Sequence, residues 1–131
     1  MIVDSSALLA IIRREPPSSE CFQALFASPV NRLSAANFLE VCLVVDGPQD
    51  PTATRELDEL IDQFSVVVEP VTVRQAHIAR RAHQLYGRGR GHPARLNFGD
   101  CFAYALAKDF DEPLLFVGQD FVHTDIRRVV S

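Results

Sequence analysis

Cysteine is scarce in this chain, and the three cysteines that it has form no motif. Cys21, Cys42 and Cys101 are odd in number and far apart, and no C-x-x-C pair occurs. Zinc cages and disulfide frameworks need paired cysteines or Cys/His clusters, so the sequence argues against both and indicates buried thiols in a reducing compartment. At 131 residues the chain is long enough to bury a core as one domain, residues 1–131, without such cross-links.

Long apolar runs are also missing. No stretch approaches the roughly 18 apolar residues that a membrane-spanning helix requires, and the sequence shows no basic and apolar leader. We therefore expect a soluble, cytoplasmic protein that does not engage a membrane.

Acidic residues are absent from one segment. The chain has 17 acids and a net charge of -4, which argues against a general nucleic-acid coat, yet no acid lies between Val71 and Gly99. That segment carries six arginines and three histidines. A basic segment on an acidic body favours local binding of an anion, although a solvated surface is the simpler alternative.

Short apolar runs alternate with amphipathic segments along the chain. We expect strands at residues 1–3, 31–34, 66–71 and 113–117, a short edge strand at 126–130, and helices at 7–12, 18–26, 35–45, 51–64, 72–86 and 100–108. Strands separated by helices predict an α/β fold with a parallel sheet covered on both faces. Residues 87–93 alternate glycine with arginine and end in proline, which predicts an exposed, mobile loop.

Three carboxylates stand alone in apolar stretches. Asp4 follows the first predicted strand, Asp100 begins the last predicted helix, and Glu40 lies mid-helix, where it cannot cap. Helix capping could explain the two aspartates, and an arginine could pair with the glutamate. One divalent cation, Mg²⁺ or Mn²⁺ as its substitute, would account for all three acids, because these ions prefer oxygen ligands and buried unpaired carboxylates are costly.

Nearby polar and basic residues extend this candidate site. Asn37 lies one helical turn before Glu40, and Ser6 follows Asp4 by two residues, so both could hold carboxylates in place; capping is an equal alternative for Ser6. Metal-binding acids beside an arginine-rich loop indicate a phosphodiester substrate, with single-stranded RNA favoured over duplex and DNA left open. The candidate phosphate-binding residues are Arg88, Arg90 and Arg95.

Taken together, these motifs resemble PIN-domain ribonucleases, and specifically the toxins of VapBC-type toxin–antitoxin pairs. The resemblance rests on residues 2–7, 34–40, 86–89, 96–107, 113–116, 120–121 and 123–126. It implies a PIN-like three-layer α/β/α domain with a mostly parallel central sheet and Mg²⁺-dependent endoribonuclease activity. It also implies that Asp4 and Asp100 bind the metal and that Glu40 is the third acid of the site.

One position departs from the family pattern. Many PIN domains carry a fourth acid where this chain has Gly118, so Asp120 is our substitute, with Asp125 behind it. A turn or capping role for Asp120 is an equal alternative, and the number of metal ions stays open.

The resemblance also implies partners. A small antitoxin would bind DNA through its N-terminal half and block the nuclease with its tail, and toxins of this kind commonly form homodimers. Apolar positions around Phe22, Phe26 and Phe38 could form a groove for the antitoxin, with core packing as the alternative role for each of them.

Two other functions fit the same chain less well. A PIN-fold binding module without nuclease activity would agree with the departure at Gly118. A phosphoacceptor domain that uses Asp4 would need a lysine near the site, and the only lysine, Lys108, lies at the far end of its predicted helix from Asp100.

Overall fold

A parallel sheet forms the centre of the molecule. The computed structural model describes residues 1–129, in which four strands are present: β1 (Ile2–Val3), β2 (Arg32–Ser34), β3 (Val67–Glu69) and β4 (Leu114–Leu115). They pair in the order β3-β2-β1-β4, and every pair is parallel. The predicted α/β fold is therefore confirmed, and these four strands form a sheet that is wholly parallel.

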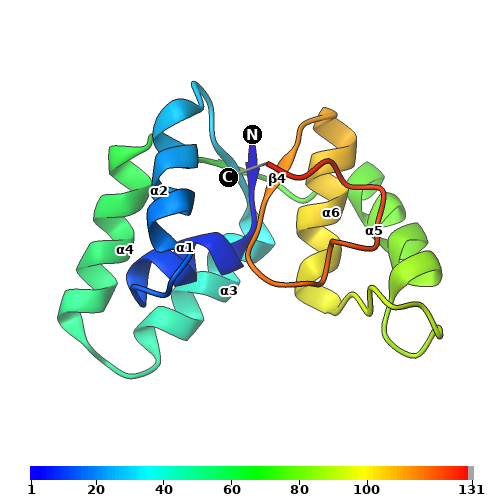
Figure 1. Cartoon of the computed structure of the whole chain (residues 1–131), viewed down its shortest axis with the longest axis horizontal. Helices are drawn as coiled ribbons and strands as arrows, with labels where there is room; N and C mark the ends of the chain where they lie inside the picture. Colours follow the sequence, from blue (N-terminus) through cyan, green and yellow to red (C-terminus); the bar gives the residue numbers. More distant parts are fainter. Residues whose placement is uncertain (130–131) are drawn as a thin grey trace.

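Helices cover both faces of this sheet (Figure 1). On one side lie α1 (Ser5–Ile12), α2 (Ser18–Ala27), α3 (Ala35–Asp46) and α4 (Pro51–Gln63); on the other lie α5 (Val73–Tyr86) and α6 (Phe98–Phe110). Parallel neighbours cannot be joined by tight hairpins, so helical crossovers must connect them. This gives the three-layer arrangement that the sequence predicts.

The central strand β1 supplies the core on both faces. Ile2 is fully buried in the cluster formed with α5 and α6, whereas Val3 is fully buried in the cluster formed with α1 to α4. This alternation follows from the opposite directions of successive side chains in a strand. Because both faces are packed, the residue that follows β1 is held firmly in place.

The loop between α5 and α6 is closed at its base. Gly87 and Leu96 form a β-bridge. The Leu96 amide donates to the carbonyl of Tyr86 at 2.8 Å, and the Arg88 amide donates back to the carbonyl of Leu96 at 3.1 Å. The loop is therefore fixed at both ends to the body of the protein.

Within this loop, glycine makes the tight turns possible. Gly89 and Gly91 have φ angles of 81° and 74°, a region that costs other residues conformational energy. The loop is exposed, as predicted, and its arginine side chains extend into solvent: Arg88, Arg90 and Arg95.

The remaining expectations from the sequence concern the edge strand, the cysteines and the membrane. A single parallel bridge joins Arg128 to Leu114, while Val130, the last residue of the predicted edge strand, lies outside the described residues. In residues 1–129 all three cysteines are free thiols, two of them buried. No helix in that part of the chain combines the length and apolar character needed to cross a bilayer.

Candidate active site

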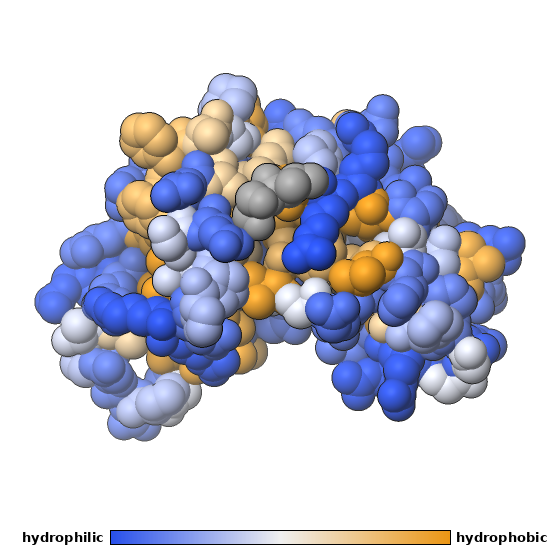
Figure 2. Space-filling view, in the orientation of Figure 1, coloured by the Kyte–Doolittle hydropathy of each residue, from blue (hydrophilic) through white to orange (hydrophobic). Residues whose placement is uncertain are grey.

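The predicted site residues converge at one edge of the sheet. Asp4 follows the carboxyl end of β1, α3 begins directly after β2, and Asp100 lies in the first turn of α6. In the view of Figures 1 and 2 this edge faces downward. Figure 2 shows that the surface is hollowed there, between the part that contains α1, α3 and α4 and the part that contains α5 and α6. The carboxyl edge of a parallel sheet is the usual place for a ligand.

Asp4 is both a helix cap and a buried acid. The residue is 4% exposed, and its Oδ2 accepts a hydrogen bond of 3.1 Å from the amide of Ser6 at the start of α1. Burial raises the pKa of Asp4 from 3.8 to about 6, although hydrogen bonds from Ser6 oppose the shift. The Ser6 hydroxyl also accepts from the amide of Val117 at 3.0 Å, which ties this turn to the segment after β4.

Asp100 combines the same two properties. It forms a capping box with Asn97, in which its Oδ2 accepts from the Asn97 amide at 3.0 Å and its own amide donates to Asn97 Oδ1 at 2.9 Å. The residue is 8% exposed. Burial raises the pKa of Asp100 to about 7, and the charges of Asp4, Asp120 and Glu40 add to the increase.

Two polar side chains hold Glu40 in place. Its Oε1 accepts from the Ser5 hydroxyl at 2.5 Å and from the Asn37 amide nitrogen at 3.3 Å. That same nitrogen donates to the carbonyl of Gly99 at 3.0 Å, which connects α3 to α6. The predicted contact between Asn37 and Glu40 is therefore present, and the residues described here contain no arginine paired with this glutamate.

Sequence reasoning missed two residues that shape this arrangement. A Cβ atom on Gly99 would overlap the Glu40 carboxylate, so only glycine leaves room for it. A glycine in the first turn of a helix is a usable signal, since it costs about 1 kcal/mol relative to alanine. The hydroxyl of Ser5 gave no such signal, because its partner on another helix is visible only in the folded chain.

Asp120 and Asp125 occupy different environments. Asp120 is exposed, and its charge raises the pKa of both Asp4 and Asp100. Burial alone would raise the pKa of Asp125, but hydrogen bonds from Tyr104 at 2.7 Å and Lys108 at 2.9 Å outweigh this and lower it. The charge of Asp120 therefore influences the two buried aspartates, whereas the charge of Asp125 is balanced by Lys108.

The acids at this edge have no cationic partner in the described part of the chain. In residues 1–129, no salt bridge involves Asp4, Glu40, Asp100 or Asp120. Two buried atoms nearby, Ser34 Oγ and Asn37 Oδ1, also lack hydrogen-bond partners among the protein groups described. The edge thus has unbalanced negative charge and unused polar atoms.

These groups fit a hydrated divalent ion better than an enclosed one. No three acidic, histidine or cysteine side chains in residues 1–129 lie close enough together to cage a metal. Mg²⁺ does not require such a cage, because it usually keeps several waters and takes one or two protein carboxylates. Asp4 and Asp100, two buried carboxylates with raised pKa values, meet that requirement.

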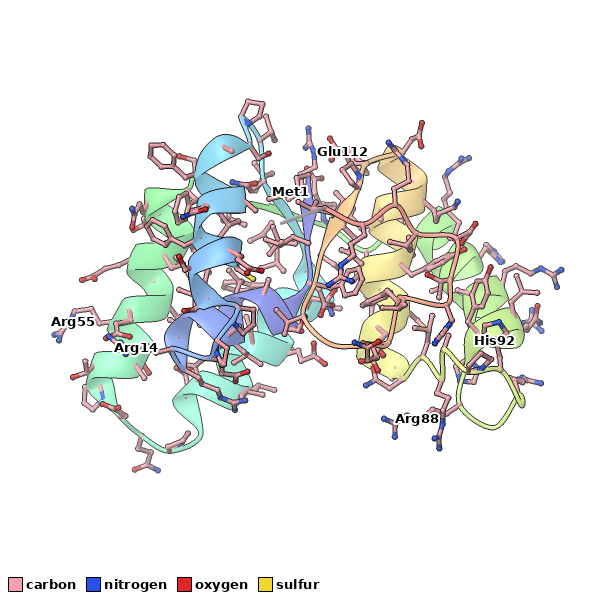
Figure 3. The ribbon with its side chains drawn as sticks, viewed as in Figure 1. Met1, Arg14, Arg55, Arg88, His92 and Glu112 are labelled. Carbon is pink, nitrogen blue, oxygen red and sulfur yellow. The ribbon has the colours of Figure 1, made fainter. Side chains whose placement is uncertain are left out.

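The predicted phosphate-binding arginines lie beside this edge. They belong to the loop that leads directly into α6, and Arg88 lies near the start of that helix in Figure 3. None of the three forms a salt bridge within residues 1–129, so their charges are available to a ligand.

Comparison with known proteins gives consistent matches along the chain. Residues 1–127 match the family model described as the PIN domain. The chain is 54% identical over 131 residues to Ribonuclease VapC28 of Mycobacterium tuberculosis, covering 100% of this chain and 98% of that protein. It is 48% identical over 127 residues to Ribonuclease VapC42 of the same species, covering 97% of each.

Solved structures match in fold at low sequence identity. Mycobacterium tuberculosis VapC20, described as a sarcin-ricin loop cleaving toxin, has a TM-score of 0.72 at 17% identity, covering 98% of this chain and 97% of that one. A toxin-antitoxin complex from Klebsiella pneumoniae has a TM-score of 0.69 at 19% identity, covering 95% and 92%. Each match extends over nearly the whole of both chains.

Proposed function

This chain is a PIN-domain ribonuclease toxin of the VapC family, and we propose that it cuts RNA phosphodiester bonds with Mg²⁺ held at the edge that carries Asp4, Glu40 and Asp100. The observation that supports this proposal is the pair of buried carboxylates, Asp4 and Asp100, whose pKa values are raised and which have no cationic partner in residues 1–129. Ionising both carboxyls in a buried site costs free energy, and a bound cation would offset that cost.

The hydrogen bonds of the two aspartates leave one oxygen of each available. The backbone amides of Ser6 and Asn97 occupy Oδ2 of Asp4 and of Asp100, so Oδ1 of each can face an ion. When bound, Mg²⁺ supplies positive charge that polarises a phosphate oxygen and lowers the pKa of water. The backbone contacts keep both carboxylates oriented for this role.

Glu40 is suited to a role toward the attacking water. Ser5 and Asn37 both bind Oε1, which leaves Oε2 to accept a hydrogen bond or a proton. Asp120 adds negative charge from the rim of the site. The exposed arginines of the 87–97 loop, Arg88, Arg90 and Arg95, would bind the flanking phosphates, with single-stranded RNA as the substrate.

A cleavage assay tests this function directly. The purified protein should cut RNA in Mg²⁺ or Mn²⁺, stop in EDTA, and lose cleavage when Asp4→Asn removes one metal-binding oxygen. RNA binding without cleavage by the wild-type protein would instead support a PIN-fold binding module. Equal cleavage by wild type and Asp4→Asn would contradict the metal-binding role of Asp4.

We also propose a cognate antitoxin as partner. Complexes of toxins with antitoxins occur among the structures of similar fold. Two adjoining hollows of about 290 and 320 Å³ lie along α1, α2 and α4 and share Ile11, with Leu60 in one and Phe22 in the other. An amphipathic antitoxin segment fits these hollows. Phe38 is partly buried and packs against the core, which is the alternative role that the sequence left open for it.

The antitoxin tail would then present a basic side chain, most suitably Arg, to the unpaired carboxylates. Co-expression with an antitoxin that lacks its tail should leave the nuclease active, because the shortened partner can still bind the groove but cannot reach the acids. Full inhibition by the shortened antitoxin would contradict this mode of blocking.

A further inference from the structure

An apolar pocket of about 450 Å³ lies between α5 and α6. It is formed by aromatic and small side chains with two basic residues: Ala76, Ala79, Arg80, His83, Phe98, Cys101 and Phe102. The rings of Phe98 and Phe102 meet edge to face, with centroids 4.8 Å apart and an interplanar angle of 87°. The pocket is therefore a hollow with an ordered aromatic wall.

Phe98 is unusual for an aromatic residue because it is 80% exposed. It occupies the first position of α6, and among the large apolar residues described it is the most exposed. The fold does not need this ring as part of the core. A single exposed apolar residue is common, but Phe98 adjoins the apolar pocket, and contiguous apolar surface commonly marks a binding site.

The charge around the pocket favours a polyanion. Arg80 and His83 come from the acid-free segment, and no acidic side chain lines the pocket. Arg95 lies three residues before Phe98 in the exposed loop. An aromatic surface within a positively charged groove is the general arrangement by which proteins bind single-stranded nucleic acid.

The pocket is also close to the proposed reaction site. Phe98 and Asp100 are two residues apart in α6, which corresponds to about 3 Å along the axis and to opposite sides of a helix about 10 Å wide. An RNA strand whose phosphate lies at Asp100 can therefore cross the start of α6 and place a neighbouring base over Phe98.

We propose that this pocket receives an unstacked base of the RNA strand, next to the bond that is cut, and that Phe98 is the surface on which that base stacks. Arg80 binds the phosphate or an edge of the same nucleotide. The proposal rests on the proposed function, since it assumes that RNA occupies the neighbouring site. A second copy of this chain covering the pocket is the competing occupant.

The first test measures binding without cleavage. A single-stranded RNA carrying the fluorescent base 2-aminopurine is titrated with protein in EDTA and low salt, and the label is moved through successive positions. With wild-type protein, one position should lose fluorescence because its base stacks on Phe98. Phe98→Ala should abolish that loss and raise the Kd about tenfold, which corresponds to about 1.4 kcal/mol.

Substitutions at the same position separate stacking from simple apolar burial. Phe98→Trp keeps a ring and should retain quenching and affinity, whereas Phe98→Leu keeps apolar bulk without a ring and should lose both. Val73→Ala is the matched control, because Val73 is an apolar residue of α5 with 76% exposure that does not line the pocket. All variants should melt near the wild-type temperature, since exposed positions contribute little to the core.

The second test uses cleavage. An RNA that is abasic at the quenched position should be cut about tenfold more slowly by the wild type, and Phe98→Ala should add little to that loss because the two changes remove the same contact. Additive losses, unchanged quenching in Phe98→Ala, or full function of Phe98→Leu would each overturn the proposal. So would a shift from dimer to monomer in Phe98→Ala with RNA binding unchanged.

Failure of the base pocket can be told apart from failure of the proposed ribonuclease mechanism. If the protein does not cut RNA, or if Asp4→Asn cuts as well as wild type, the metal-dependent mechanism fails. The quenching experiment in EDTA still decides whether a base enters the pocket.

Discussion

The two ends of the sheet differ in whether their charged groups are paired within the chain. Where β1 and β2 begin, the amino group of Met1 lies 3.4 Å from Glu112, and Arg32 lies 3.7 Å from Glu112. Arg32 also lies 2.7 Å from Glu69, the last residue of β3, so this acid too has a cation within the chain. Figure 3 shows Met1 and Glu112 together at this end. Where the strands end, the described residues include acids without cations and, in the nearby loop, arginines without acids.

This difference separates stability from activity. Charges that are neutralised within the chain stabilise the fold and are not free to bind a ligand. Charges that stay unpaired raise the energy of the folded protein, as the raised pKa values of Asp4 and Asp100 indicate, and are available to a metal ion and to phosphates. Substitutions where the strands begin should mainly lower stability, and substitutions where the strands end should mainly lower activity.

The largest expected effect is at Asp100. Asp100→Asn keeps most of the capping hydrogen bond but removes one charge from a repulsive cluster, so the metal-free protein should melt at an equal or higher temperature. Cleavage in Mg²⁺ should fall at least about 100-fold, because a weakly held ion cannot orient water.

Glu112→Gln is the matched change at the other end of the sheet. It should lower stability by up to about 1 kcal/mol, as expected for a partly exposed ion pair, and leave cleavage intact. Thermal melts in EDTA and cleavage rates measure the two effects. Retained cleavage by Asp100→Asn would refute its metal-binding role whatever the melts show.

The unpaired arginines provide the next largest effect. Replacing Arg88, Arg90 and Arg95 together by alanine should weaken RNA binding and flatten its salt dependence by about two units of log–log slope, at roughly 0.7 per phosphate contact on a single strand. Fluorescence anisotropy at several salt concentrations measures the slope. A control that removes the same charge elsewhere replaces Arg13, Arg55 and Arg127. Equal slopes in the two triple variants would mean that the loop arginines make no phosphate contacts.

A smaller effect is expected at Gly99. Gly99→Ala places a methyl group where the Glu40 carboxylate lies, so the carboxylate must move away from its position beside α6. We expect roughly a tenfold loss in kcat with the melting temperature nearly unchanged, because a helical alanine regains about 1 kcal/mol of propensity. Gly47→Ala, at the end of α3, is the control and should leave kcat unaltered. Wild-type kcat in Gly99→Ala would show that the exact place of Glu40 does not matter.

The smallest effect concerns pH and metal together. Because burial raises the pKa of Asp4 from 3.8 to about 6 and of Asp100 from 3.8 to about 7, the stability that these two protonated groups contribute to the metal-free protein should be greatest below about pH 4 and should be lost as the pH rises to about 7. Mn²⁺ competes with those protons, so it should raise the melting temperature by on the order of 5 °C at pH 8 and by almost nothing at pH 5. Melts at both pH values with and without Mn²⁺ measure this difference. An equal effect at pH 5 would place the ion elsewhere.

The sequence allowed the fold and the main acids to be predicted because both leave local signals. Buried parallel strands are short apolar runs, and a lone acid within apolar residues stands out. The start of α6 was predicted too late, since Asn97 and Asp100 cap the helix at Phe98 through reciprocal contacts. β3 was predicted too long, and it ends before Pro70, which has no amide to donate.

Contacts between distant segments left no such signal. The bond between Ser5 and Glu40 joins two helices, and the space for Glu40 depends on Gly99, nearly sixty residues later. Asp125, named behind Asp120 as a possible fourth acid, is hydrogen-bonded to Tyr104 and Lys108 on α6, and these contacts leave no local pattern in the sequence. The metal-binding and RNA-binding roles of the site residues remain predictions.

The position of β1 in the middle of the sheet has a consequence for folding kinetics. Ile2 pairs with Arg32 on one side and with Leu114 on the other, so β1 is complete in the sheet only after a segment much later in the chain has been made. Pairings between such distant segments raise the contact order, which slows folding. Asp4 reaches its buried position only when β4 has docked. We therefore expect the growing chain to remain inactive toward RNA until residues beyond Leu115 have emerged.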